Sequence, residues 1–244
     1  MLLAVDIGNT NIDFGVFKRD RLLSKFSIPT NARSPGLLKK GLGGKRVDDV
    51  LICSVVPEAT RSLLRGLKGL VVGKPHIVGK DIKVPIRNLY RKPAQVGQDR
   101  LVNAYAGVAL YGAPLIAVDF GTAVTFDIIS GKGDYSGGMI LPGLQLCLDI
   151  LGERASLLPK IKLEKPGEFI GRDTKNSMLS GVVYGLAALT DDLVVRIRGR
   201  IGKGALAVGT GGSIGLMKSY CKRLDRVDPD LTLKGLNLIW RNKC

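Results

Sequence analysis

The stretch AVDIGNTNIDFG, residues 4–15, ends an apolar run with an acidic side chain and then turns through small and polar residues. Asp6 closes the run, and Gly8, Asn9 and Thr10 separate it from a second apolar run. At the carboxyl edge of an open α/β sheet, where ligands usually bind, such a turn can hold a phosphate, because glycine lets backbone amides approach and threonine donates its hydroxyl. The aspartate can anchor a cation. Taken alone, the stretch fits either a phosphate-binding hairpin or an ordinary hairpin with Gly8 and Asn9 in its turn.

The same pattern occurs again in the second half of the chain. LLAVDIG at 2–8 returns as LIAVDFG at 115–121, and each copy is followed by a threonine-containing turn and another apolar segment. The Gly-Ala-Pro sequence at 112–114, just before the second copy, is typical of a boundary. We therefore predict two homologous halves, residues 1–112 and 113–244.

Apolar spacings between these motifs alternate between those of strands and those of helices, which predicts an α/β protein. One helix is predicted to begin near Pro57 and another to cover 96–112, where a glycine ends it. Further strands are predicted at 12–17, 21–28, 115–120, 123–129 and 136–140. Further helices are predicted after Pro142 and over 174–199.

The last of these helices is the longest, and helical spacing predicts one apolar stripe along it. We expect most of this stripe to lie in the core of the protein. Gly181 and Gly185, four residues apart on the same helix, would also permit close packing against another subunit. The predicted stripe consists of Met178, Val182, Leu186, Leu189, Leu193 and Ile197.

Composition and charge limit the possible classes of function. The 244 residues are 45% hydrophobic and carry a net charge of +16, which attracts anions but is accompanied by no nucleic-acid-binding motif. Four cysteines without CxxC spacing and a single histidine do not favour zinc, redox or Ser-His-Asp chemistry. Charged residues interrupt the apolar stretches, and the amino terminus has no basic leader. We expect a cytoplasmic protein with neither a membrane nor nucleic acid as its partner.

Two further motifs extend the pattern of the opening hairpin. VDFGTAVTFD at 118–127 contains the second acidic turn, and GTGGS at 209–213 follows the apolar ALAV. Together with the first hairpin they resemble the actin-like ATPase and sugar-kinase superfamily. The resemblance implies two actin-like, ribonuclease H-like halves with mixed sheets flanked by helices. It also implies binding of ATP, with Thr122 reaching ATP and the glycine turn contacting adenosine. It also implies that phosphate and metal are held by Asp6, Ile7, Gly8, Asn9, Thr10, Asn11, Ile12 and Asp13.

Three other motifs narrow the resemblance. VGQDR at 96–100, GGMILPG at 137–143 and TKNSMLSG at 174–181 resemble the signatures of type III pantothenate kinases, over nearly the whole chain. The resemblance implies that ATP phosphorylates pantothenate to 4'-phosphopantothenate in the first step of coenzyme A synthesis, and that the protein is a homodimer. It further implies Mg²⁺ near Asp6 and a monovalent cation, K⁺ or NH₄⁺, at Asp119. The implied pantothenate-binding residues are Tyr90, Gly97, Gln98, Asp99, Arg100 and Thr174.

Asp99 is the residue most open to physical argument. It lies in the first turn of a predicted helix, where a carboxylate stabilises the helix dipole by about 0.3 to 1 kcal/mol, and this alone could explain its presence. A hydroxyl-phosphorylating enzyme also needs a base for the alcohol proton, and the neighbouring Arg100 could bind an acidic substrate. In the family the corresponding aspartate is the proton acceptor, so we expect Asp99 to be the general base.

Other site residues have structural alternatives. Tyr90 could cover the core from a loop, and Asp119 could be a structural cap. Family members commonly have Asn before the threonine of the last motif, whereas this chain has Asp173, which could alter hydrogen bonding around Thr174. For function, the alternatives are another small-molecule kinase or a phosphatase on the same scaffold, or a noncatalytic basic regulator.

Overall fold

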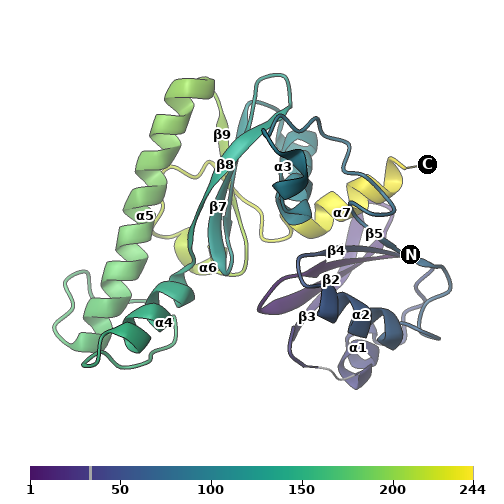
Figure 1. The fold of residues 1–244 in the computed structure, drawn as a ribbon, viewed down its shortest axis with the longest axis horizontal. Coiled ribbons are helices and arrows are strands. Elements are labelled where there is room, and N and C mark those ends of the chain that lie inside the picture. The colour runs from purple at the N-terminus through teal and green to yellow at the C-terminus, as the bar shows by residue number, and fades with distance from the viewer. Residues whose placement is uncertain (33–34, 244) are drawn as a thin grey trace. The chain divides into compact units, whose positions relative to one another are not determined.

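The structure is a computed structural model that describes residues 1–32 and 35–243. The chain forms two units, each built around its own five-stranded mixed sheet (Figure 1). Unit 1 comprises Met1–Ile86, Arg91–Ala106 and Leu231–Cys244, and unit 2 comprises Arg87–Tyr90 and Gly107–Asp230.

The sheet of unit 1 has the strand order β3-β2-β1-β4-β5. Strands β1 to β3 are antiparallel neighbours, and β4 and β5 continue the sheet in parallel with β1. The central strand β1 is almost continuously apolar because helices cover both faces of the sheet. The strand bounds are β1 (Leu2–Ile7), β2 (Asn11–Lys18), β3 (Arg21–Pro29), β4 (Asp49–Ser54) and β5 (Pro75–Ile77).

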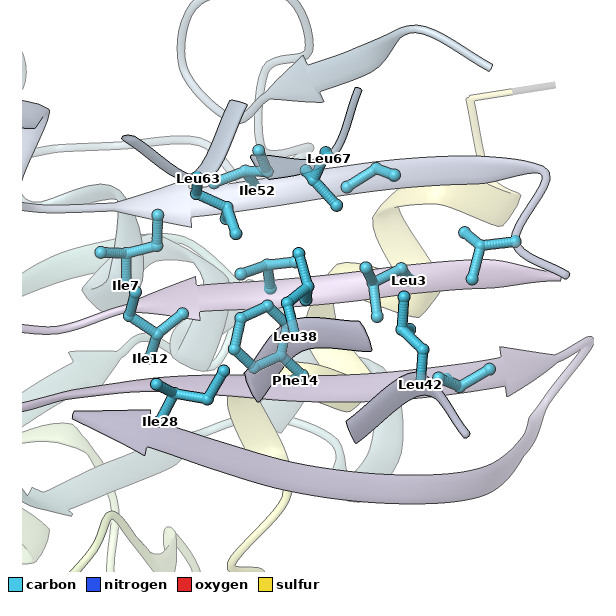
Figure 2. Packing of buried hydrophobic residues seen from close by; sticks show 14 of the residues in the cluster. Leu3, Ile7, Ile12, Phe14, Ile28, Leu38, Leu42, Ile52, Leu63 and Leu67 are labelled. Atoms are coloured by element: carbon cyan, nitrogen blue, oxygen red, sulfur yellow. The ribbon is translucent and has the colours of Figure 1, made fainter. Parts of the chain in front are cut away.

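Alternate residues of β1 face two different helical layers. Leu3 and Ile7 pack with Phe14 of β2 under α1 (Pro35–Leu42) and α2 (Pro57–Gly66), as Figure 2 shows. On the opposite face, Leu2 and Ala4 pack in a second buried cluster with Val102 of α3 and Leu236 of α7. The short 3₁₀ helix η1 (Pro93–Gln95) precedes α3 (Gln98–Tyr111), whose last residues belong to unit 2, and α7 covers Leu231–Arg241.

The sheet of unit 2 repeats the topology of unit 1. Its order is β10-β9-β6-β7-β8, so β6 to β8 are antiparallel neighbours and β9 and β10 extend the sheet in parallel with β6. This equivalence confirms the predicted structural repeat and the α/β class. The strand bounds are β6 (Leu115–Phe120), β7 (Ala123–Ile129), β8 (Tyr135–Pro142), β9 (Leu206–Thr210) and β10 (Arg226–Val227).

The compact units follow a different boundary from the two predicted halves. Helix α7, from the end of the chain, packs with its Leu233, Leu236 and Ile239 against β1 and β4 of unit 1. The reason is its apolar face, which buries against the side of the first sheet that α1 and α2 leave uncovered. The division of the sequence at residues 112 and 113 stays a prediction about homology.

Helices α4 (Leu144–Arg154), α5 (Thr174–Ile201) and α6 (Ile214–Met217) belong to unit 2. Met178 and Ile197 of the predicted α5 stripe are buried, but the other predicted residues are only half-buried. For most of the helix, the buried line lies one residue further along. It consists of Leu179, Val183, Ala187, Thr190, Val194 and Ile197.

Helix α5 has the length and the apolar composition of a membrane span, contrary to the expectation that charges interrupt every such stretch. Of its most apolar 18-residue window, 44% is buried inside the protein. Val183, Ala187 and Val194 lie in the main core of unit 2. We therefore interpret α5 as a core helix.

Candidate active site

The opening stretch forms the hairpin between β1 and β2, as predicted. Gly8 N donates to Asn11 O at 2.9 Å across the turn, and Thr30 Oγ1 donates to Gly8 O at 2.7 Å. Asp6 and Asp13 are directly opposed across the two strands. Opposed like charges destabilise a strand pair, so a bound cation would stabilise this arrangement.

Asp99 lies in the first turn of α3, as predicted. Its Oδ1 accepts a hydrogen bond from Arg100 N at 2.9 Å. Burial raises the pKa of the Asp99 carboxyl, against the opposing effects of the Arg100 amide and the Arg100 charge. The carboxylate folds back over Gly97, where any side chain would collide with Asp99 Oδ1. The motif GQDR therefore builds a desolvated carboxylate beside Arg100, a cationic residue that is itself 8% exposed.

Cys53 lies within reach of the charges of both Asp6 and Asp99 in unit 1. This cysteine is fully buried on β4, in register with Asp6 on β1. Burial raises the pKa of its thiol well above the usual value, and the negative charges of Asp6 and Asp99 raise it further. Both carboxylates are therefore close enough to act on the same thiol, and Cys53 itself stays protonated and unreactive at neutral pH. No sequence motif indicated this residue.

The second acidic hairpin meets the glycine turn inside unit 2. Asp119 on β6 is in register with Thr210 on β9, directly before Gly211 of the GTGGS turn. Ser213 N donates to Phe120 O at 3.0 Å, which holds the turn against the end of β6. Gly211 has φ +94, and a Cβ there would collide with Asp119 Oδ1 and lie 2.7 Å from Phe120 N.

Substitution of Gly211 by alanine tests this contact. We expect the Gly211→Ala variant to lose stability, by about 1 to 3 kcal/mol for a side chain in a left-handed conformation, and to bind ATP more weakly because Asp119 must move. Thermal unfolding and ATP titration measure the two effects. Gly112→Ala is the control, because Gly112 has φ +87 but nothing lies within 4 Å of a Cβ at that position.

Thr122 lies at the tip of the second hairpin and is exposed. Its carbonyl accepts a hydrogen bond from Gly143 N at 3.0 Å, and a Cβ at Gly143 would meet the carbonyls of Gly121 and Thr122. The motif GGMILPG thus ends in a glycine that lets α4 begin directly beside the hairpin, a contact that the motif alone did not reveal.

The predicted substrate residues divide between the units. Gly97, Gln98, Asp99 and Arg100 belong to unit 1, whereas Tyr90 and Thr174 belong to unit 2. 

Tyr90 lies in a short segment that is held to unit 2 through Tyr135. Leu89 N donates to Tyr135 O at 2.9 Å, and the rings of Tyr90 and Tyr135 are 6.5 Å apart. Tyr135 in turn donates to Oδ1 of the fully buried Asp127 at 3.0 Å. Tyr90 therefore packs on a fixed aromatic neighbour.

Asp173 is the N-cap of α5, directly before Thr174. Its Oδ1 accepts from Asn176 N at 2.8 Å and its Oδ2 accepts from the Asn176 side chain at 2.7 Å. These bonds hold the pKa of the Asp173 carboxyl below its usual value. Asn and Asp are comparable N-caps, so the departure from the family pattern keeps the helix start that places Thr174.

Among the residues that the structure describes, no three His, Cys, Asp or Glu side chains come together. These residues therefore form no metal site made of protein side chains alone. Within 1–32 and 35–243, Cys53, Cys147 and Cys221 are free, and Cys244 lies outside the described residues. Burial raises the pKa of Cys221 to about 12.

The family model for type III pantothenate kinase matches residues 2–196. A curated relative from Agathobacter rectalis, named type III pantothenate kinase, is 39% identical over 100% of this chain and 98% of its own length.

Solved structures show the same fold. A Campylobacter jejuni protein described as a Baf family transcriptional activator has a TM-score of 0.61 at 20% identity and covers 99% of this chain and 98% of its own. A Sinorhizobium meliloti protein described as a 2-dehydro-3-deoxygalactonokinase has a TM-score of 0.58 at 14% identity, covering 100% and 99%. The fold is therefore that of the actin-like ATPases and sugar kinases.

Proposed function

The chain belongs to the type III pantothenate kinase family, and from this membership we propose that it transfers the γ-phosphoryl group of ATP to the primary hydroxyl of pantothenate. The product is 4'-phosphopantothenate, the first intermediate of coenzyme A synthesis. The observation that carries the proposal beyond the family match is Asp99, a carboxylate with a raised pKa at the start of α3. Phosphoryl transfer depends mainly on positioning and charge neutralisation, which such a site can supply.

On the acceptor side, Asp99 accepts the proton of the attacking hydroxyl. A raised pKa makes its carboxylate a stronger base than an exposed aspartate. The neighbouring Arg100 guanidinium attracts the carboxylate of pantothenate. Gln98 and the backbone of Gly97 are further proposed contacts, and the family resemblance also implies contacts through the hydroxyls of Tyr90 and Thr174.

On the nucleotide side, the turn from Gly8 to Asn11 offers backbone amides and polar side chains to phosphate. The donor set fits Mg²⁺, since this ion is usually held by one or two carboxylates together with substrate phosphates and water, and Asp6 faces Asp13 here. When bound, Mg²⁺ neutralises charge on the phosphates. Thr122 and the GTGGS turn are the proposed contacts of unit 2 with ATP.

Asp119 is the proposed residue for K⁺ or NH₄⁺. Its carboxylate lies against the backbone of Gly211. A Cβ at Gly121, if one were present, would be 3.4 Å from Asp119 Oδ1. A single carboxylate beside the main chain suits a monovalent cation better than a small divalent one. Backbone carbonyl oxygens can coordinate a monovalent cation in irregular geometry.

Formation of phosphopantothenate from ATP, Mg²⁺ and pantothenate tests the function directly. We expect turnover that depends on pantothenate and rises on addition of K⁺ or NH₄⁺. A panel of sugars and polyphosphate is the control for the acceptor. ATP consumption that depends on a panel compound and not on pantothenate would point to another kinase. Absent turnover together with sequence-selective DNA binding at physiological salt would point to a regulator.

We also propose a cytoplasmic homodimer formed through unit 2. Gly181 and Gly185 lie exposed on α5, with nothing within 4 Å of a Cβ at either position. Unit 2 also exposes large apolar side chains on α4, on β8 and in the segment between α4 and α5, and large exposed apolar surfaces commonly mark interfaces. They are Met139, Ile140, Leu146, Ile150, Leu151, Leu157, Phe169 and Ile170.

Sedimentation equilibrium tests the dimer. We expect wild-type protein to sediment as a dimer and Gly185→Arg to sediment as a monomer, because the large cation would prevent close helix packing. Gly199→Arg, on the same helix and equally open, is the control that should remain dimeric. A fully active wild-type monomer at working concentration would contradict the proposal.

A further inference from the structure

Gly79 lies in a tight turn that no sequence motif connected with the site. Gly79 N donates to Ile82 O at 2.7 Å, and Ile77 N donates to Asp81 Oδ2 at 2.8 Å. Val78 and Ile82, on either side of the turn, are buried in the same cluster as Val102 of α3. Turn and helix therefore share one packed core within unit 1, and their relative position is fixed.

The side chain of Gln98, the first residue of α3, lies over this turn at Gly79. A Cβ at position 79 would be 2.6 Å from Gln98 Cδ, 2.8 Å from its Oε1 and 2.9 Å from its Cγ. Gly79 also has φ +83, a conformation that side chains rarely adopt. The positive φ thus favours glycine at position 79, and any side chain there would force the side chain of Gln98, the residue next to Asp99, to move.

We propose that Gly79 is a positioning residue for the acceptor site, because its missing side chain lets the Gln98 amide lie across the turn and point where pantothenate is held. The inference rests on the proposed function, in which Gln98 contacts pantothenate. A side chain at position 79 displaces the Gln98 amide and removes one of its hydrogen bonds to the substrate. Asp99 keeps its own hydrogen bond to Arg100 N.

The test compares Gly79→Ala with Gly69→Ala. Gly69 also lies in an exposed turn of unit 1 and has φ +76, but nothing lies within 4 Å of a Cβ there, so it reproduces the backbone strain without the contact. We expect Gly79→Ala to raise KM for pantothenate about threefold to tenfold, the loss of one neutral hydrogen bond, with a smaller effect on kcat. Gly69→Ala should leave both parameters unchanged.

A double-variant cycle shows whether the effect passes through Gln98. In a Gln98→Ala background the collision is absent, so we expect Gly79→Ala to cause no further rise in KM. Thermal unfolding of all variants gives a second measurement: the destabilisation by Gly79→Ala beyond that by Gly69→Ala should disappear in the Gln98→Ala background, even where the single variant folds poorly.

The outcomes separate this inference from the proposed function. Wild-type protein that fails to phosphorylate pantothenate would overturn both. Wild-type activity together with equal kinetics and equal stability of Gly79→Ala and Gly69→Ala would overturn the inference alone. Effects of Gly79→Ala that persist unchanged in the Gln98→Ala background would also overturn it.

Discussion

The Asp99→Asn variant is expected to turn over pantothenate about 10² to 10⁴ times more slowly than wild type, equivalent to roughly 2.7 to 5.5 kcal/mol of transition-state stabilisation. The amide has nearly the same shape as the carboxylate but cannot accept the proton of the attacking alcohol. Binding of both substrates should persist, so the loss should be in kcat. Steady-state kinetics with a direct phosphopantothenate readout measures it.

Stability provides the control for this substitution, and its sign can be worked out. Burial raises the pKa of Asp99 in the folded protein above its unfolded value of about 3.9. Between these two pKa values the folded state binds more protons than the unfolded state, so the stability contributed by this group falls as pH rises through that window. Asp99→Asn removes the cost of ionisation and should be at least as stable as wild type at pH 7. Urea unfolding at neutral pH measures this.

The same pKa predicts the acid limb of the activity profile. The carboxylate must be ionised to act as a base, so kcat should fall as the pH decreases. The midpoint of this fall should lie at a higher pH than the pKa of an ordinary aspartate. An Asp99→Asn protein with wild-type turnover would show that the carboxylate only stabilises the helix dipole.

The Asp6→Asn variant is expected to lose about 10² in kcat/KM for ATP, the size of effect seen when one group that stabilises transition-state charge is removed. The loss should become smaller as the Mg²⁺ concentration rises, because the proposed role of Asp6 is to hold that ion. Kinetics over a range of Mg²⁺ concentrations tests this dependence.

Asp20→Asn is the matched control for Asp6→Asn. Asp20 is an exposed carboxylate of the same unit, paired with Arg241, and its removal should change neither activity nor the Mg²⁺ dependence. A loss in Asp6→Asn that is the same at every Mg²⁺ concentration would assign Asp6 a structural role in the hairpin.

The local elements could be predicted well because their signals lie within a few residues of one another. The strands on both sides of each acidic turn, the helix that begins at Pro57 and the helix that carries Asp99 in its first turn are all present. Short elements such as α1 and β5 were not predicted, because their apolar residues are too few to show a period. The predicted stripe on α5 lies, for most of its length, one residue before the buried line. Periodicity alone does not choose between two neighbouring lines of side chains along a helix.

The sequence by itself determined the repeated acidic hairpins, the α/β class and the motifs that indicate the family, because each depends on residues that are close along the chain. Only the tertiary structure decided that α7 packs on the first sheet, that burial raises the pKa of Asp99 and that Cys53 lies near both Asp6 and Asp99. It also placed Gly79 under Gln98. Desolvation and close contact depend on which distant segments meet, and that is settled only when the whole core packs.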